Sequence, residues 1–140
     1  EFNLGVLATY QDAKIRKALV NGVPNTALQG NRVMRQPKLQ LRLSPSYELA
    51  IGDWNVNLYG AAAIVDDRFG DLANTTVLKG FTKVDAGIKV ETPWGVFGQV
   101  HADNLFNSHG LTEGDPRNPA APNGRPILGR SFRFSVGYDF

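Results

Sequence analysis

Hydrophobic and polar residues alternate along most of this chain with a period of two, which is the period of a β-strand. Helical spacing is almost absent. We therefore expect an all-β, antiparallel, up-and-down arrangement of about six strands. Each strand is about twice the modal length of strands in soluble proteins. The expected strands cover residues 3–13, 37–49, 54–65, 80–92, 96–106 and 129–140.

Sorting the strand positions by parity separates two faces. One face has no charged residue, whereas the other carries many. One face is therefore expected to meet an apolar medium and the other to meet water. The alternation alone fits a soluble sheet with one buried face as well as a sheet that faces lipid. The charged positions are Lys38, Arg42, Glu48, Lys83, Asp85, Lys89, Glu91, Asp103, Arg133 and Asp139.

The connections between the expected strands alternate between short and long. Residues 50–53 and 93–95 form short turns, whereas 14–36, 66–79 and 107–128 form long connections. In a meander, alternate connections lie at the same end of the sheet. All short turns are thus expected at one rim and all long loops at the other, as in outer-membrane β-barrels.

Aromatic residues of the uncharged face gather towards its two rims, while its middle is mostly aliphatic. Bilayers draw amphipathic rings to their two interfaces, where the polar tip of the ring stays hydrated. The spacing of the two groups fits a tilted strand that crosses a hydrocarbon core of roughly 30 Å. The expected membrane-interface girdle comprises Tyr10, Tyr47, Trp54, Trp94 and Phe106.

The last strand alternates strictly up to the final residue, which is aromatic. A soluble domain has no physical reason to end a long strand in this way. We interpret this segment as a barrel-assembly signal with its rings and aliphatic side chains on one face, at Phe132, Phe134, Val136, Tyr138 and Phe140.

Composition excludes several classes of protein. The chain has no Cys, which excludes a disulfide scaffold and a zinc–thiolate site. Its 15 Lys and Arg against 13 Asp and Glu give a net charge of +2, and no short segment concentrates basic residues as a nucleic-acid site would. Its longest apolar run, 60–65, is far too short for a membrane helix. The first residues have no signal-peptide pattern, so we expect a fragment or a processed product.

Four segments together resemble the C-terminal part of TonB-dependent outer-membrane receptors. The terminal strand resembles the signal read by the outer-membrane barrel assembly machinery. Residues 103–107 (Asp-Asn-Leu-Phe-Asn) resemble the Asn-Leu-Phe element that closes the next-to-last strand in that family. Residues 3–14 resemble its strand ending in Tyr-x-Asp-Ala, and 80–85 resemble its strand opening with an aromatic and then Val-Asp.

This resemblance implies a 22-stranded transmembrane barrel in the bacterial outer membrane, with residues 1–140 as its last six strands. It also implies a plug domain and a TonB box in a part of the protein that lies outside this sequence. The implied activity is TonB-powered uptake of a scarce nutrient. A ferric siderophore or similar metal chelate is favoured as the ligand, with a carbohydrate or cobalamin as alternatives. The implied partners are lipid, the plug and remaining strands, the TonB complex and the assembly machinery.

The long loops contain the candidate ligand-binding residues. Basic side chains suit an anionic ferric chelate, whereas carboxylates beside an aromatic ring suit a sugar. Both kinds occur here, so the ligand class stays open on the residues alone. The candidates are Arg32, Arg35, Asp67, Arg68, Phe69, His109 and Arg117.

The sequence indicates no enzyme, cofactor or metal site. His101 and Asp103 share the charged face at i, i+2, and we expect a polar pair rather than a catalytic dyad. No Ser lies in a Gly-x-Ser-x-Gly setting. Cross-strand ion pairs or plug contacts are expected from charges such as Lys83 with Glu91 and Arg42 with Asp85.

Two alternatives stay open. A soluble ligand-binding β-barrel or sandwich would turn the uncharged face inward. A different outer-membrane barrel, of the porin or adhesin type, would keep the uncharged face towards lipid but would lack a plug. The sequence upstream of residue 1 would separate a receptor from a porin.

Overall fold

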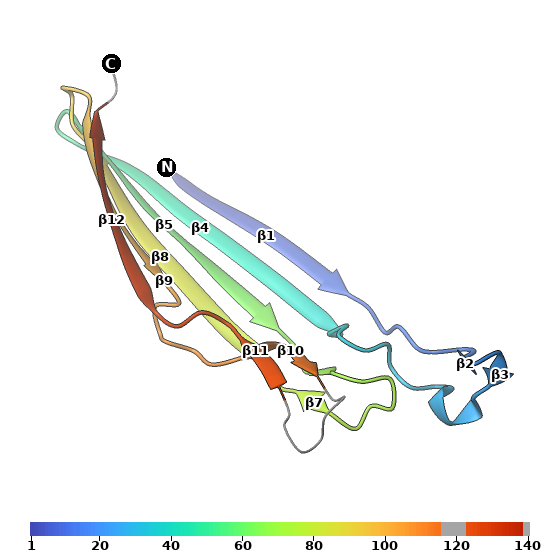
Figure 1. Ribbon diagram of the computed structural model, residues 1–140. Coiled ribbons are helices and arrows are strands. Elements are labelled where there is room, and N and C mark those ends of the chain that lie inside the picture. Colours follow the sequence, from blue (N-terminus) through green and yellow to red (C-terminus); the bar gives the residue numbers. More distant parts are fainter. Residues whose placement is uncertain (116–122, 139–140) are drawn as a thin grey trace.

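The computed structural model describes residues 1–115 and 123–138. Six long strands form a single antiparallel sheet in the order β1-β4-β5-β8-β9-β12 (Figure 1). These are β1 Phe2–Tyr10, β4 Leu39–Ile51, β5 Trp54–Val65, β8 Phe81–Glu91, β9 Val96–Asp103 and β12 Ser131–Tyr138. The expected six-stranded meander is confirmed.

Strand boundaries follow the parity pattern closely. β5 spans the expected residues, whereas β1 ends at Tyr10 and β9 ends at Asp103, earlier than expected. β9 ends there because Asn104 adopts a φ of 48°, which leaves the extended region. The turn between β4 and β5 is shorter than expected, since β4 continues to Ile51.

The long connections contain short hairpins that the sequence pattern did not predict. The first connection contains β2 Leu19–Val20, β3 Val23–Pro24 and a 3-10 turn at Thr26–Leu28. The second contains β6 Arg68–Phe69 paired with β7 Val77–Leu78, and the third contains β10 Leu111–Asp115 paired with β11 Asn123–Pro126. Figure 1 shows all of these hairpins at one end of the sheet and the short turns at the other.

The sheet has one layer. Within the described residues, Leu78 and Ala102 are the buried hydrophobic side chains, whereas Phe134 and Val136 are 75% and 82% exposed. β1 and β12 lie at the two edges and are not paired with each other in the described part. The described chain therefore neither closes into a barrel nor covers its own apolar face. Within 1–115 and 123–138, no helix is long and apolar enough to cross a bilayer.

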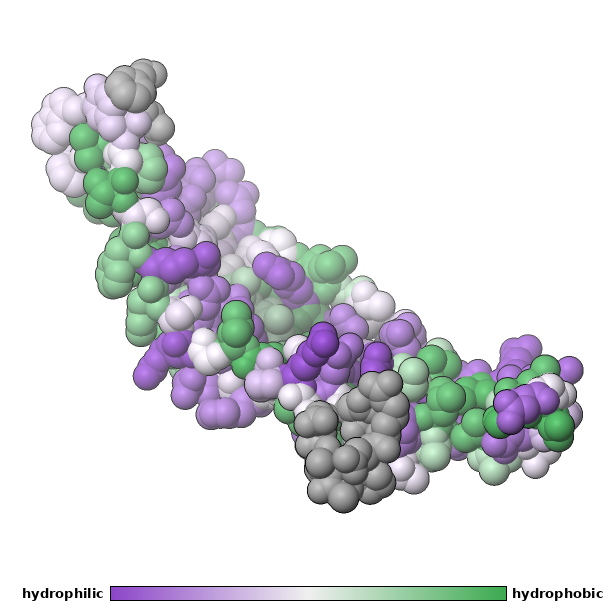
Figure 2. Space-filling model, viewed as in Figure 1, coloured by the Kyte–Doolittle hydropathy of each residue, from purple (hydrophilic) through white to green (hydrophobic). Residues whose placement is uncertain are grey.

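The two faces differ in chemistry along the whole sheet. A row of apolar side chains crosses four strands at Leu58, Ile88, Val100 and Phe134, which are neighbours in the strand register. The opposite face, the polar face hereafter, carries the ionic side chains of β4, β8, β9 and β12, together with polar side chains of β5. Figure 2 shows hydrophilic residues along the middle of the molecule, with hydrophobic residues among them and towards both ends.

Candidate functional site

The three long connections, residues 14–36, 66–79 and 107–128, contact one another at their end of the sheet and are called the loop layer hereafter. The first connection docks on the second through a reciprocal pair. The backbone N–H of Arg32 donates to Asn74 Oδ1 at 2.7 Å, and Asn74 Nδ2 donates to the Arg32 carbonyl at 3.0 Å. Asn74 has a φ of 60°, a conformation that Asn tolerates better than most residues. Arg35 continues the contact by donating its N–H to the Phe69 carbonyl at 2.6 Å.

The second connection docks on the third through Arg68. This side chain is only 5% exposed and donates hydrogen bonds to the carbonyls of Leu111 and Thr112, the second at 3.1 Å. Its guanidinium also lies over the Phe81 ring, 5.8 Å from the centroid. Burial lowers the pKa of Arg68 from its ordinary value, because desolvation disfavours the charged form. Arg68 therefore holds two loops together here, and contact with a ligand stays a prediction.

A mixed-charge cluster forms where the first and third connections meet. The Glu113 carboxylate forms ion pairs with Arg35 at 3.5 Å and with Arg125 at 3.4 Å. All three side chains are at least 40% exposed. Beside it, the Arg32 guanidinium lies over the Phe69 ring, 5.4 Å from the centroid. Two arginines against one glutamate leave a net positive patch that faces solvent. Exposed ion pairs of this kind contribute little to stability, so a ligand displaces them at low cost.

Two aspartates fix the second connection. Asp67 Oδ1 accepts the Gly80 N–H at 2.6 Å, and this bond, together with Lys79, lowers the pKa of Asp67. Asp71 accepts the N–H groups of Thr75 and Thr76 at 2.9 and 2.8 Å. Burial of Asp71 opposes ionisation, but the hydrogen bonds from Thr75 and Thr76 outweigh it and lower the pKa of Asp71 to about 2.

The pKa of Asp71 sets the pH range over which its hydrogen bonds stabilise this connection. Because its pKa in the folded state lies below the ordinary 3.8, the stabilisation is fully present at pH values well above 3.8 and is lost as the pH falls through about 2. We expect Asp71→Ala to speed amide exchange of Thr75 and Thr76 roughly ten-fold at neutral pH, as loss of charge-assisted hydrogen bonds predicts. Asp53→Ala, in the short turn at the opposite end, is the control. Protection of Thr76 that is unchanged in Asp71→Ala would contradict this role.

The remaining predicted site residues belong to the third connection, the girdle and the last strand. His109 is exposed in the third connection, whereas Arg117 and Phe140 lie outside the described residues. Trp54 and Trp94 meet edge to face across the short-turn rim, with ring centroids 6.3 Å apart. Their girdle role stays a prediction. Exposed girdle and β12 side chains on the apolar face are Tyr10, Tyr47, Trp54, Trp94, Phe106, Phe132, Phe134, Val136 and Tyr138.

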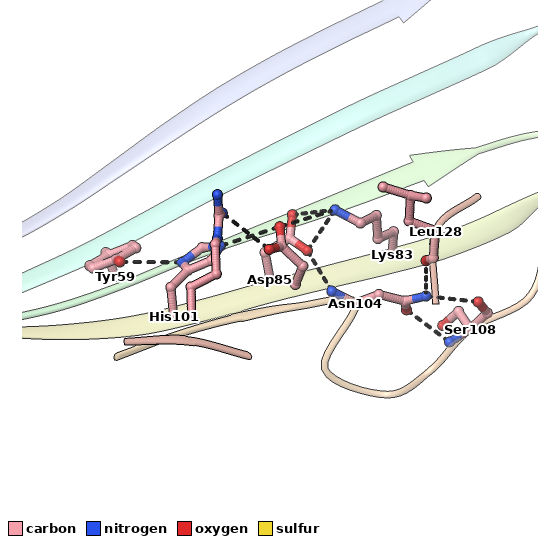
Figure 3. Close-up of polar contacts among 9 residues, drawn as sticks. Tyr59, Lys83, Asp85, His101, Asn104, Ser108 and Leu128 are labelled. Atoms are coloured by element: carbon pink, nitrogen blue, oxygen red, sulfur yellow. Dashed lines mark hydrogen bonds and ion pairs between the residues drawn. The ribbon is translucent and has the colours of Figure 1, made fainter. Parts of the chain in front are cut away.

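A continuous polar network runs along the polar face between β5, β8, β9 and β12 (Figure 3). The Tyr59 hydroxyl contacts Gln99 Nε2 at 2.5 Å and His101 Nδ1 at 3.2 Å, and the Tyr59 and His101 rings stack at 5.7 Å. His101 Nε2 in turn lies 3.4 Å from Asp103, which also binds Arg133 at 3.1 Å. The expected pairing of His101 with Asp103 is confirmed.

Gly87 makes this stack possible. It is paired in register with Tyr59 on one side and His101 on the other, and a Cβ at position 87 would overlap the Tyr59 ring. The ring therefore lies flat across the β8 backbone. A hollow of about 360 Å³ remains beside it, lined by Tyr59, Gln99, His101, Arg133 and Ser135.

The expected ion pair of Lys83 with Glu91 is wrong, whereas that of Arg42 with Asp85 stays a prediction. Lys83 binds Asp85 at 2.7 Å and lies 4.0 Å from Asp103, whereas Glu91 is bound by Lys89 at 2.5 Å. Lys83 and Glu91 lie on one strand eight residues apart, beyond the reach of the two side chains. Side chains two apart on a strand share a face, and this spacing selects the pairs that form.

Sequence reasoning missed the residues that hold the loops together. Asn74, Asp71 and Glu113 are polar loop residues with no periodic signal. Asn74 and Glu113 find partners in the first connection, whereas Asp71 binds Thr75 and Thr76 of its own connection. For Asp71 and Asn74, the spacing Asp-x-x-Asn favours a turn, but it does not indicate which residues these side chains contact. Tyr59 and Gln99 have the same strand parity as the charged positions, but their contact depends on strand register.

The fold is similar to parts of solved outer-membrane receptors, although no protein-family model matches the sequence. The siderophore receptor PiuA from Acinetobacter baumannii aligns over 98% of this chain and 19% of its own, with a TM-score of 0.78 and 22% identity. BauA, the ferric preacinetobactin receptor of the same organism, aligns over 98% and 20%, with the same TM-score and identity. FyuA, the ferric yersiniabactin uptake receptor of Yersinia pestis, aligns over 99% and 21%, with a TM-score of 0.82 and 16% identity.

This chain therefore spans about a fifth of the length of the receptors it matches. Its all-β fold is similar to that of a section of these siderophore and ferric-chelate receptors.

Proposed function

We propose that this chain forms part of the barrel wall of a TonB-dependent receptor in the bacterial outer membrane. One observation carries the proposal: a single-layered meander of long strands has one uncharged face, and this meander aligns along almost its whole length with receptor barrels. The uncovered apolar face suits acyl chains, and the polar face suits a wet interior. A soluble sandwich would need a second layer over the apolar face, and the described residues supply none.

In this proposal, residues 1–140 are the last six strands, and the plug and the other strands lie in the rest of the protein. Both edges of the sheet then pair with further strands, because an open edge in hydrocarbon leaves backbone groups without hydrogen bonds. The network of Tyr59, His101 and Asp103 faces the plug. The assembly machinery reads the aromatic face of β12. Energy reaches the plug from the TonB complex.

The ligand proposed for the loop layer is a ferric siderophore or a similar anionic chelate. Support comes from the exposed positive patch of Arg35 and Arg125, with the half-buried Arg32 beside it, which suits carboxylate, catecholate or hydroxamate oxygens. PiuA, BauA and FyuA are each named for siderophore chemistry. A sugar site is less well supported, because the Phe69 face is occupied by Arg32. No catalytic step is assigned to any residue.

Uptake by the full-length protein tests this function. Cells that express it as their sole iron receptor are given radioactive iron bound to a hydroxamate, a catecholate or a mixed chelate. Saturable uptake of one chelate, abolished by a protonophore, is expected. Uptake that rises linearly with concentration and ignores the protonophore would indicate a porin and contradict the proposal. Protonophore-sensitive uptake of cobalamin or an oligosaccharide alone would support the receptor function but would contradict a ferric chelate as the ligand.

A further inference from the structure

The Asn104 side chain forms hydrogen bonds to both ends of the connection between β9 and β12, and these bonds are called the staple hereafter. It is fully buried, and its Oδ1 accepts the Ser108 N–H at 2.8 Å. Its Nδ2 donates to the carbonyls of Ser108 and Leu128, both at 2.9 Å. One amide group therefore joins the beginning of this connection to its end, although Ser108 and Leu128 are far apart in sequence.

Asn107 supplies a second staple at the same place. Its backbone N–H donates to the Asn104 carbonyl at 2.7 Å, and its Oδ1 accepts the Arg130 N–H at 3.1 Å. Asn104 and Asn107 both have positive φ values, of 48° and 52°, which bend the chain tightly enough for these bonds. Asn is among the few residues other than Gly that adopt this conformation readily.

The staple is tied directly to the ion network of the polar face. The backbone N–H of Asn104 donates to Asp85 Oδ1 at 2.8 Å. Asp85 also binds Lys83, which lies within 4.0 Å of Asp103, the partner of Arg133. Figure 3 shows this run of contacts from Tyr59 to Leu128. Asp85 therefore belongs both to the network and to the loop staple.

We propose that Asn104 is a positioning residue that couples the ion network of the polar face to the connection between β9 and β12, through its bond to Asp85. A negatively charged group in front of the polar face would compete with Asp85 and Asp103 for the cationic side chains of Lys83 and Arg133. The competition shifts Asp85, weakens its hold on the Asn104 N–H and loosens the stapled ends. By linkage, a ligand that reorders the connection changes the network by the same free energy. The coupling does not depend on which ligand the protein takes.

Hydrogen exchange of the full-length protein in detergent micelles tests the coupling. Asp85→Ala is expected to speed exchange in peptides spanning 105–112 and 127–131 about ten-fold. Asp85→Asn keeps an acceptor for the Asn104 N–H and is expected to restore most of the protection. Glu91→Gln removes an ion-pair partner on the same strand, away from the staple, and is expected to leave these peptides unchanged. A loop that is unaffected by Asp85→Ala, or affected equally by Glu91→Gln, would overturn the proposal.

A double-variant comparison separates coupling from local damage. If the effect of Asp85→Ala passes through Asn104, it adds little exchange in an Asn104→Ala background. Effects that simply add would show two independent roles and overturn the proposal. If Asn104→Ala does not fold, Asn104→Asp serves instead, since it keeps the acceptor for Ser108 and removes the donor to Leu128. These measurements need no ligand, so the uptake proposal and the coupling proposal fail separately.

Discussion

Ile88→Arg is expected to lower the free energy of unfolding in a bilayer by about 2–4 kcal/mol, the cost of a lipid-facing arginine near the bilayer midplane. Ile88 lies in the middle of the apolar row, between Leu58 and Val100 in the register, and is 37% exposed. Among the described strand residues no carboxylate shares its face, so the new guanidinium has no acidic group there to offset its desolvation. Denaturation midpoints of the full-length protein in liposomes provide the measurement.

Ser135→Arg is the matched control for this charge. It lies on the polar face of β12, exposed and opposite Gln99 in the register. Its cost is expected to stay within about 0.5 kcal/mol, as is usual for surface substitutions. Equal costs for the two arginines, or a larger cost at Ser135, would place the apolar face away from lipid.

Gly87→Ala is expected to cost about 1–3 kcal/mol, the usual range for overpacking. The added Cβ would displace the Tyr59 ring and break its stack on His101 and its bond with Gln99. Gly98→Ala is the matched control, because a Cβ at position 98 meets nothing within 4 Å. The same denaturation experiment reports both variants.

A double variant checks the cause. Tyr59→Ala removes the ring that the new Cβ would meet, so Gly87→Ala is expected to cost little in that background. If Gly87→Ala costs the same with and without the Tyr59 ring, or if Gly98→Ala is equally harmful, the close approach of ring and backbone is not the reason.

The sequence predicted the sheet because strand parity is a local property. The bounds of β5 and the pairing of His101 with Asp103 follow from alternation alone. Charges were paired wrongly at Lys83 because the choice among partners depends on spacing along the strand and on register. The stack of Tyr59 over Gly87 needs the register of β5 against β8, which parity does not fix.

The loop layer was predicted only as a set of polar candidates. Two-residue strands such as β6 have no period to detect, and the contacts of Arg32 with Asn74 join connections far apart in sequence. Arg68 was proposed for its charge and proved to be buried. Asn104 was singled out by resemblance to a family element, whereas its role as a staple depends on burial and a positive φ.

The orientation of the apolar face is tested most directly by the accessibility of spin labels along β8 in the full-length protein reconstituted in a bilayer. Labels at Val84, Ala86 and Ile88 are expected to collide frequently with oxygen dissolved in the lipid. Labels at Lys83, Asp85 and Lys89, which have the opposite parity on β8, are expected to be shielded from it, so that accessibility alternates with a period of two. The opposite phase, or uniform shielding on both faces, would contradict a lipid-facing apolar surface.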